Sequence, residues 1–116
     1  MDFDAAIRAH SEWKQKLTRY LKNPDRSLDC NQVQKDDQCA LGQWLHGEGK
    51  AFAHQPEYRE LLRKHADFHR AAGAIVRRID TGEKIAEDVL FGSRSDYGRL
   101  SGEVVLLIMN MRKKAA

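Results

Sequence analysis

Two histidines of one predicted helix are spaced so that both imidazole rings can bind a single metal ion. His65 and His69 lie in the stretch from Leu61 to Ile79, LLRKHADFHRAAGAIVRRI, whose apolar residues recur at the spacing of one helix face. Four residues of an α-helix turn through about 40° more than one full turn and rise about 6 Å, so the two side chains share a face. Both fall on the apolar stripe and are predicted to point toward the core. The pair supplies half of a four-coordinate site.

Two further residues complete a set of four possible ligands. His10 lies within the apolar face of a predicted N-terminal helix, and Cys39 falls in the first turn of a short helix predicted to begin at an N-cap at Asp36 or Asp37. That position favours a thiolate, the form that binds metals and reacts with oxidants. One thiolate and three imidazoles form a tetrahedral donor set for zinc.

Each of these residues also has a purely structural interpretation. A histidine on an apolar stripe can be a hydrogen-bonded core residue, and a buried cysteine can act as a small hydrophobic side chain. Their spacing along the chain is not that of a compact zinc finger. His46 and His54 lie in segments flanked by glycine or proline and are expected at the surface. Cys30 is expected to be a loop thiol.

The candidate ligands are expected on helices that pack into one bundle. Apolar periodicity, with breaks at proline and glycine, predicts these helices: Asp2 to Leu21, Asp37 to Leu45, Pro56 to Asp80 and Glu83 to Lys113. The last helix is weakest from Gly92 to Gly98, where it could be kinked or broken. The polar stretch from Arg26 to Asp36 is expected to be a loop with at most one helical turn. Residues 1–116 should form a single all-α domain, an antiparallel four-helix bundle with a short extra helix that carries Cys39.

The composition narrows the class of protein. The 116 residues carry a net charge of +3, with basic and acidic residues interleaved along the predicted helix surfaces. We therefore expect no nucleic-acid partner. The longest apolar run, Val104 to Met109, is too short to span a bilayer, and no charged-then-apolar leader opens the chain. These features predict no membrane insertion and a cytoplasmic location, where Cys30 and Cys39 would remain thiols.

Three short motifs together resemble the signatures of the chemoreceptor zinc-binding domain family. HSEW begins at His10, CALGQWL at Cys39 and HADFH at His65, similar to the HxxW, CxLGxWL and HxxFH patterns of that family. The resemblance extends over nearly the whole chain, with the motifs in the same order. It implies an all-helical zinc-binding bundle, usually dimeric, with His10, Cys39, His65 and His69 as the ligands. The tryptophans of the first two motifs are expected to pack around the site.

The resemblance and the ligand chemistry together predict a regulatory or sensory zinc domain and not an enzyme. Members of the family are attached to bacterial chemoreceptors or diguanylate cyclases, so the expected roles are chemotaxis or cyclic-di-GMP control. The expected partners are a second copy, docked through the last helix as a homodimer, and a chemoreceptor or diguanylate cyclase. The chain contains no GG(D/E)EF stretch and no receptor coiled coil, and its Met1 start and basic tail favour a free-standing member.

Two inputs are expected for such a sensor. Loss of zinc, or oxidation of Cys39, would switch the segment around Cys39 between docked and mobile states. Cys30 could then resolve an oxidised Cys39 as a disulfide.

Other functions remain open at this point. Zinc could have a purely structural role, stabilising a helical module for interaction or dimerisation. A di-iron carrier of the hemerythrin type needs more inward-facing histidines and bridging carboxylates, and a thiolate is not expected in it. A zinc hydrolase needs an open coordination position and a general base, whereas the chain lacks an HExxH motif and four protein ligands would close the site. Covalent haem has no support because no CxxCH motif is present.

Overall fold

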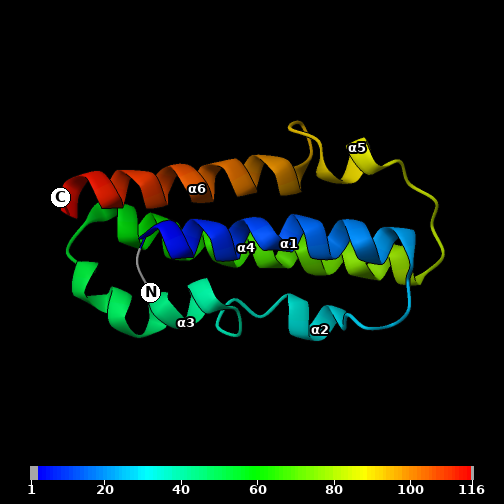
Figure 1. The fold of residues 1–116 in the computed structure, drawn as a ribbon, viewed down its shortest axis with the longest axis horizontal. Coiled ribbons are helices and arrows are strands. Elements are labelled where there is room, and N and C mark those ends of the chain that lie inside the picture. The colour runs from blue at the N-terminus through cyan, green and yellow to red at the C-terminus, as the bar shows by residue number, and fades with distance from the viewer. Residues whose placement is uncertain (1–2, 116) are drawn as a thin grey trace.

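The fold was analysed in a computed structural model that describes residues 3–115, and every regular element in this range is a helix. Three long helices run most of the length of the molecule (Figure 1): α1 (Phe3–Lys22), α4 (Pro56–Asp80) and α6 (Asp96–Ala115). The remaining elements are short: α2 (Cys30–Val33), α3 (Ala40–His46), the 3₁₀ helix η1 (Glu48–Phe52) and α5 (Glu87–Phe91). None of the described helices has the length and hydrophobicity needed to cross a membrane.

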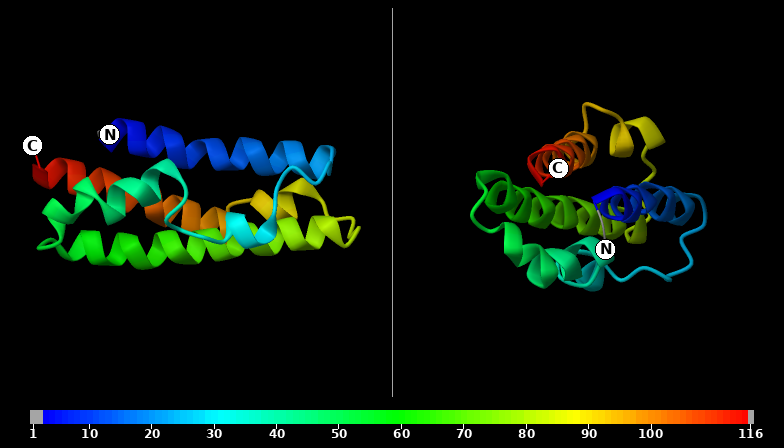
Figure 2. Two further views of the ribbon diagram at one scale, coloured as in Figure 1. Left: turned by 90° about the horizontal axis from the view of Figure 1, so that it is seen from below. Right: turned by 60° about the vertical axis from the view of Figure 1, so that its left-hand side comes forward.

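The helices alternate in direction along the chain. Helices α1 and α4 run the same way, while α6 and the segment containing α2, α3 and η1 run the opposite way (Figures 1 and 2). The molecule measures 45 × 25 × 19 Å. This arrangement confirms the predicted antiparallel four-helix bundle. Its second side is a series of short helices, which agrees with the loop and the short extra helix expected between residues 26 and 45.

Helix α4 lies at the centre of the packing. It contacts α1, α2 and α6, and Pro56 occupies the start of the helix, where the missing N–H costs no hydrogen bond. Its buried residues recur at steps of three and four: Tyr58, Leu61, His65, Phe68, His69, Ala72, Gly73, Ile75, Val76 and Ile79. Burial of each large apolar side chain contributes about 1.5–3 kcal/mol, so this stripe fixes α4 at the core. The two histidines are held by the same packing.

The last predicted helix is wrong in extent. A last helix from Glu83 to Lys113 was expected, with a kink or break allowed from Gly92 to Gly98. The break is present there, but residues 81–86 are irregular, α5 is short, and α6 begins only at Asp96. Gly92 ends α5, and the Ser95 hydroxyl accepts a hydrogen bond from the Gly98 N–H at 2.9 Å, capping a new helix. A glycine that ends one helix and a serine cap three residues later together outweigh the apolar periodicity on either side.

The other boundaries agree more closely. The first helix was predicted from Asp2, which lies outside the described residues, and it ends at Lys22, one residue later than expected. The single helical turn allowed in the polar segment after Pro24 is α2, and the Asp29 carboxylate caps it by accepting from the Asn31 N–H. The expected short helix is α3, although it starts at Ala40 and not at Asp37.

A glycine in the middle of α4 allows α2 to lie directly against that helix. A Cβ atom at Gly73 would lie 2.9 Å from Cβ of Gln34 and 3.1 Å from the carbonyl oxygen of Cys30. Both neighbours belong to the α2 turn or its cap, so a side chain at this position would displace α2. By contrast, a Cβ at the exposed Gly102 of α6 meets no atom within 4 Å.

Substitution of the two glycines should therefore have opposite effects. Gly73→Ala should lower the free energy of unfolding by about 1–3 kcal/mol, because steric overlap outweighs a gain of about 1 kcal/mol in helix propensity. Gly102→Ala, the matched control, should raise it by about 0.5–1 kcal/mol. Urea unfolding of the metal-free proteins measures both values. Equal stabilisation by the two substitutions would show that α2 is not packed closely on α4.

Candidate metal centre

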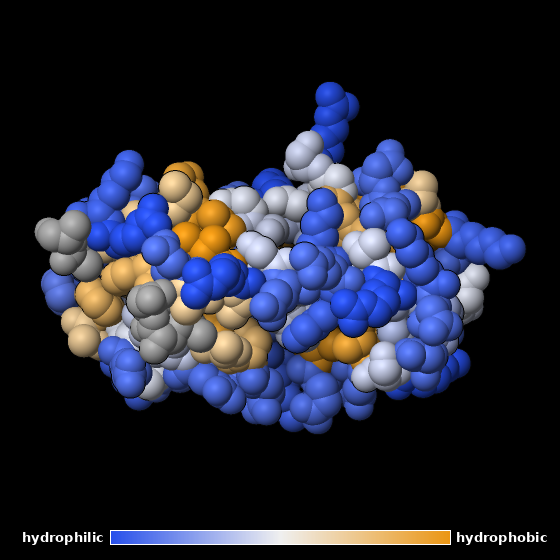
Figure 3. Space-filling view, viewed as in Figure 1, coloured by the Kyte–Doolittle hydropathy of each residue, from blue (hydrophilic) through white to orange (hydrophobic). Residues whose placement is uncertain are grey.

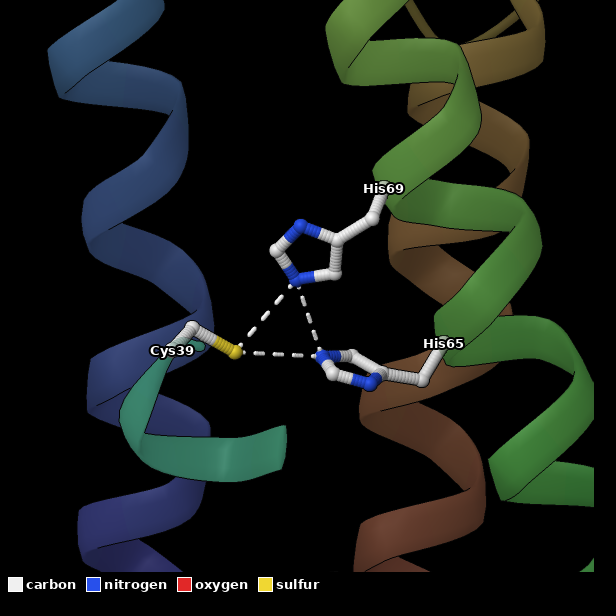
Figure 4. A group of neighbouring side chains, drawn as sticks. All are labelled: Cys39, His65 and His69. Carbon is white, nitrogen blue, oxygen red and sulfur yellow. Dashed lines mark hydrogen bonds between the residues drawn. The ribbon is translucent and has the colours of Figure 1, made fainter. Parts of the chain in front are cut away.

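Three predicted ligands converge on one point between α4 and the start of α3. His65 and His69 project from successive turns of α4 and are each 1% exposed, while Cys39 approaches from the residue before α3 (Figure 4). The Cys39 Sγ atom lies 3.3 Å from the Nε2 atoms of both histidines, and these two nitrogens are 3.1 Å apart. The three side chains form a candidate metal-binding group.

The triangle formed by these three atoms has the dimensions of a zinc site. Zn–S bonds of about 2.3 Å and Zn–N bonds of about 2.0–2.1 Å, at tetrahedral angles, place sulfur and nitrogen about 3.5 Å apart and two nitrogens about 3.3 Å apart. The observed separations are shorter by only about 0.2 Å. The three donors thus fit one face of a zinc tetrahedron without rearrangement of the backbone.

The tautomer of His69 is set by the backbone of α2. Nδ1 of His69 lies 2.8 Å from the carbonyl oxygen of Val33. A carbonyl oxygen only accepts hydrogen bonds, so Nδ1 carries the proton and donates it. The lone pair of His69 is therefore on Nε2, the atom that faces Cys39 and His65. Such a second hydrogen bond is the usual means by which proteins orient a metal-binding imidazole.

Cys39 is held in place as the N-cap of α3. The Cys39 backbone is extended, with φ −79° and ψ 164°, and Sγ accepts a hydrogen bond from the Gly42 N–H at 3.2 Å. The prediction of Asp36 or Asp37 as N-cap was therefore wrong, as was the placement of Cys39 within the first turn. The helix starts later than predicted because the backbone of Asp36 lies against Gly42, where a Cβ would lie 1.7 Å from the Asp36 carbonyl oxygen. The chain before Cys39 folds over this glycine, which explains the glycine of the CALGQWL motif.

Burial controls the protonation of the group in the absence of a metal. It lowers the pKa of His65 to about 3, with a smaller contribution from neighbouring histidines, and it also lowers the pKa of His69. The imidazoles are therefore neutral, as metal binding requires. Burial raises the pKa of the Cys39 thiol, and the amides at the start of α3 oppose this only in part. The expectation that the helix start alone favours a thiolate is thus incomplete, and a bound cation is needed to stabilise that form.

The fourth predicted ligand, His10, lies beside this group but not within it. It projects from α1, is 3% exposed, and packs on the ring of Phe68 with a centroid distance of 4.3 Å. Its Nε2 atom is 3.0 Å from the Ser101 hydroxyl of α6, and its Nδ1 atom is buried without a hydrogen-bond partner. Burial lowers the pKa of His10 to about 4, so this imidazole is neutral as well. A buried nitrogen without a partner is compatible with a ligand position, although Nδ1 of His65, whose Nε2 faces the group, is also without a partner.

The two tryptophans of the motifs have different positions. Trp13 packs edge-on against His69, with a centroid distance of 5.4 Å and an interplanar angle of 88°, so it supports the site as expected. Trp44 packs instead against Phe3 and Phe52, where it joins α3 and η1 to the start of α1.

The remaining histidines and the second cysteine lie outside the group. His46 and His54 are exposed, as predicted, and His46 Nε2 lies 3.5 Å from a carboxylate oxygen of Asp36. Cys30 is a free, half-buried thiol at the start of α2.

A cavity of about 450 Å³ lies next to Cys39, between α1 and the segment from Ser27 to Ala40. Trp13 and Lys16 line it on the α1 side, and Leu28, Val33 and Cys39 are among the residues on the opposite side. Cys39 is half-buried, whereas His65 and His69 are fully buried. The thiol is therefore the ligand of the group most accessible to small molecules.

Comparison with known families identifies the chain. Residues 10–76 match the family model of the chemoreceptor zinc-binding domain. Comparison with curated proteins and with solved structures gives no match. The matched span begins at His10 and includes Cys39, His65 and His69, and zinc is the metal that this family binds. Because the match covers more than half of its length, the chain belongs to the chemoreceptor zinc-binding domain family, whose members are sensory domains of chemotaxis signalling and not catalytic ones.

Proposed function

We propose that this chain is a zinc-dependent sensory domain of bacterial signalling, in which Cys39, His65, His69 and His10 hold Zn²⁺. The observation that carries the proposal is the approach of one sulfur and two imidazole nitrogens to within 3.1–3.3 Å of one another. In this domain the ion supplies a positive charge that stabilises the thiolate and links helices that otherwise only pack. The output is chemotaxis or cyclic-di-GMP control, and the chain itself is not an enzyme.

The ligands differ in how firmly the protein holds them, which is what a sensor requires. His65 and His69 are fixed by the apolar packing of α4 on α1, α2 and α6. Cys39 belongs to a segment of short helices, and a metal bond from its sulfur would tie that segment to α4. Loss of the ion should therefore loosen residues 26–46 first, because metal binding contributes directly to the order of the elements it joins.

Oxidation of Cys39 is the second input in this proposal. When hydrogen peroxide meets the thiolate, the sulfur attacks one peroxide oxygen, the O–O bond breaks, and hydroxide leaves. The sulfur loses two electrons and becomes a sulfenic acid, which is a poor zinc ligand. The cavity beside Cys39 offers room for the oxidant. The Cys30 thiol would then condense with the sulfenic acid, forming a disulfide and releasing water.

The partners and location are also part of the proposal. A homodimer through α6 is supported by Leu106, which is 57% exposed on that helix. Figure 3 shows the larger apolar area toward the end of the molecule where α6 ends and α1 begins, with smaller apolar areas near the opposite end of a largely hydrophilic face. The dimer would act on a chemoreceptor or diguanylate cyclase. The two free thiols fit a cytoplasmic location.

A structural zinc staple is the second candidate, because the same three converging donors would serve it equally well. Only the response to metal loss separates the two functions. A di-iron carrier has less support, since no carboxylate joins the metal-binding group in residues 3–115.

The proposed function makes a prediction about metal content. Wild-type protein should bind one Zn²⁺ per chain, and Cys39→Ala should bind it more weakly by roughly 100-fold. This factor follows because a four-ligand zinc site contributes ~10–16 kcal/mol, or about 3 kcal/mol per ligand. Cys30→Ala is the matched control and should retain wild-type affinity. Elemental analysis and competition with a chromogenic chelator measure stoichiometry and affinity. Equal affinity of Cys39→Ala and wild type would exclude the assigned site.

A further prediction separates a sensory zinc site from a purely structural one. Peroxide or hypochlorite should release zinc from wild-type protein and increase amide hydrogen exchange in residues 26–46, while α4 remains protected by its own packing. Cys30→Ser should release zinc at a similar rate but yield sulfinic acid in place of a disulfide, as mass spectrometry would detect. Zinc release without any change in exchange would favour the staple. Unchanged oxidation products in Cys30→Ser would remove Cys30 from the scheme.

A further inference from the structure

A serine on α6 contacts the one predicted ligand that lies outside the three-residue group. The Ser101 hydroxyl is 3.0 Å from Nε2 of His10, although the two residues are 91 positions apart in the chain. Ser101 also lies beyond residues 10–76, the span matched by the family model. The contact therefore connects the first motif, on α1, with α6, a helix that lies outside the matched residues.

The two ring nitrogens of His10 are in different situations. Nε2 has a partner in the Ser101 hydroxyl, while Nδ1 is buried and has none. A buried nitrogen without a partner costs free energy, and a bound cation would remove that cost. His69 shows a comparable division, since its Nδ1 bonds to the Val33 carbonyl and its Nε2 faces Cys39 and His65. His65 differs from both, because its Nδ1 is also buried without a partner while its Nε2 faces the group.

We propose that Ser101 positions His10 as the fourth zinc ligand. The serine oxygen accepts the Nε2 proton of His10, which leaves the lone pair of the imidazole on Nδ1 as the metal-binding atom. His10 would then offer Nδ1 to the ion, whereas His65 and His69 would offer Nε2, the atoms that face Cys39. This inference rests on the proposed zinc function and adds α6 to the elements that the site holds together.

The position of Ser101 gives this contact a consequence for signalling. Helix α6 carries the exposed Leu106, five residues beyond Ser101, and it packs on both α1 and α4. If metal loss moved the His10 ring, its hydrogen bond to Ser101 would transmit that movement to α6. The apolar face proposed for dimerisation lies on the helix that would receive it.

Zinc affinity of three α6 variants tests the proposal. Ser101→Ala should weaken zinc binding by about 10- to 100-fold, the usual effect of removing a hydrogen-bond partner of a metal-binding histidine. Ser101→Thr keeps the hydroxyl and should bind like wild type. Gly102→Ala changes the adjacent, exposed position and should also leave affinity unchanged. Wild-type affinity in Ser101→Ala, or tighter binding, would overturn the role of Ser101.

The nitrogen that binds the metal is tested separately by ¹⁵N NMR of the histidine rings. In the zinc-loaded protein, His10 should show a protonated Nε2 and a metal-shifted Nδ1, and Ser101→Ala should lose this pattern. Metal binding through Nε2 of His10 would overturn the proposal even if affinity changed. Wild-type protein that binds no zinc would refute the proposed function itself, whereas zinc-binding wild type with an unaffected Ser101→Ala would refute only this inference.

Discussion

The structure depends on the close approach of three electron-rich atoms in a buried space. Sγ of Cys39 and Nε2 of His65 and His69 lie within 3.3 Å of one another. The Val33 carbonyl places the lone pair of His69 on the nitrogen that faces this centre. Such an arrangement is unfavourable in a low-dielectric interior unless a proton or a cation lies between the donors. Zn²⁺ matches the donor types, their separations and the metal of the family.

The rest of the fold provides the means to hold these atoms together. Helix α4 supplies both imidazoles on one buried stripe, and Gly73 of the same helix admits α2, which brings the Val33 carbonyl to His69. Gly42 allows the chain to fold over the start of α3, so that Cys39 becomes its N-cap and Sγ faces α4. The α4 side is held by the core, while the Cys39 side depends on short elements. Under the proposed function, this asymmetry makes the Cys39 side the first part of the fold to respond to metal loss.

The sequence predicted the long helices and the paired histidines because both follow from the spacing of residues along one helix. It predicted Cys39 as a ligand by type and motif, but it placed the residue inside the helix and not at the cap. The N-cap assignment depends on Asp36 folding over Gly42, a tertiary contact that no local pattern records. A kink or break before α6 was anticipated between Gly92 and Gly98, but the start of the new helix at Asp96 was not, since the capping role of Ser95 competes with an apolar repeat that continues on both sides.

Two contacts of the site could not have been read from the sequence at all. The oxygen that orients His69 is a backbone carbonyl, which every residue possesses, so Val33 carries no sequence signal for this role. Ser101 is an ordinary serine on an amphipathic helix, and only the packing of α6 on α1 brings it to His10. In both cases the candidate ligand was predictable from the sequence, while the group that contacts its second ring nitrogen was not. Orienting groups are selected by three-dimensional position and not by residue type.

The most direct test of the central claim is X-ray absorption at the zinc edge of the purified wild-type protein. The assigned site predicts a first coordination shell of one sulfur at about 2.3 Å and three nitrogens at about 2.0–2.1 Å, with the outer-shell scattering of imidazole rings. A shell without sulfur, or one with two sulfurs, would contradict the assignment of Cys39 and the histidines as the ligands.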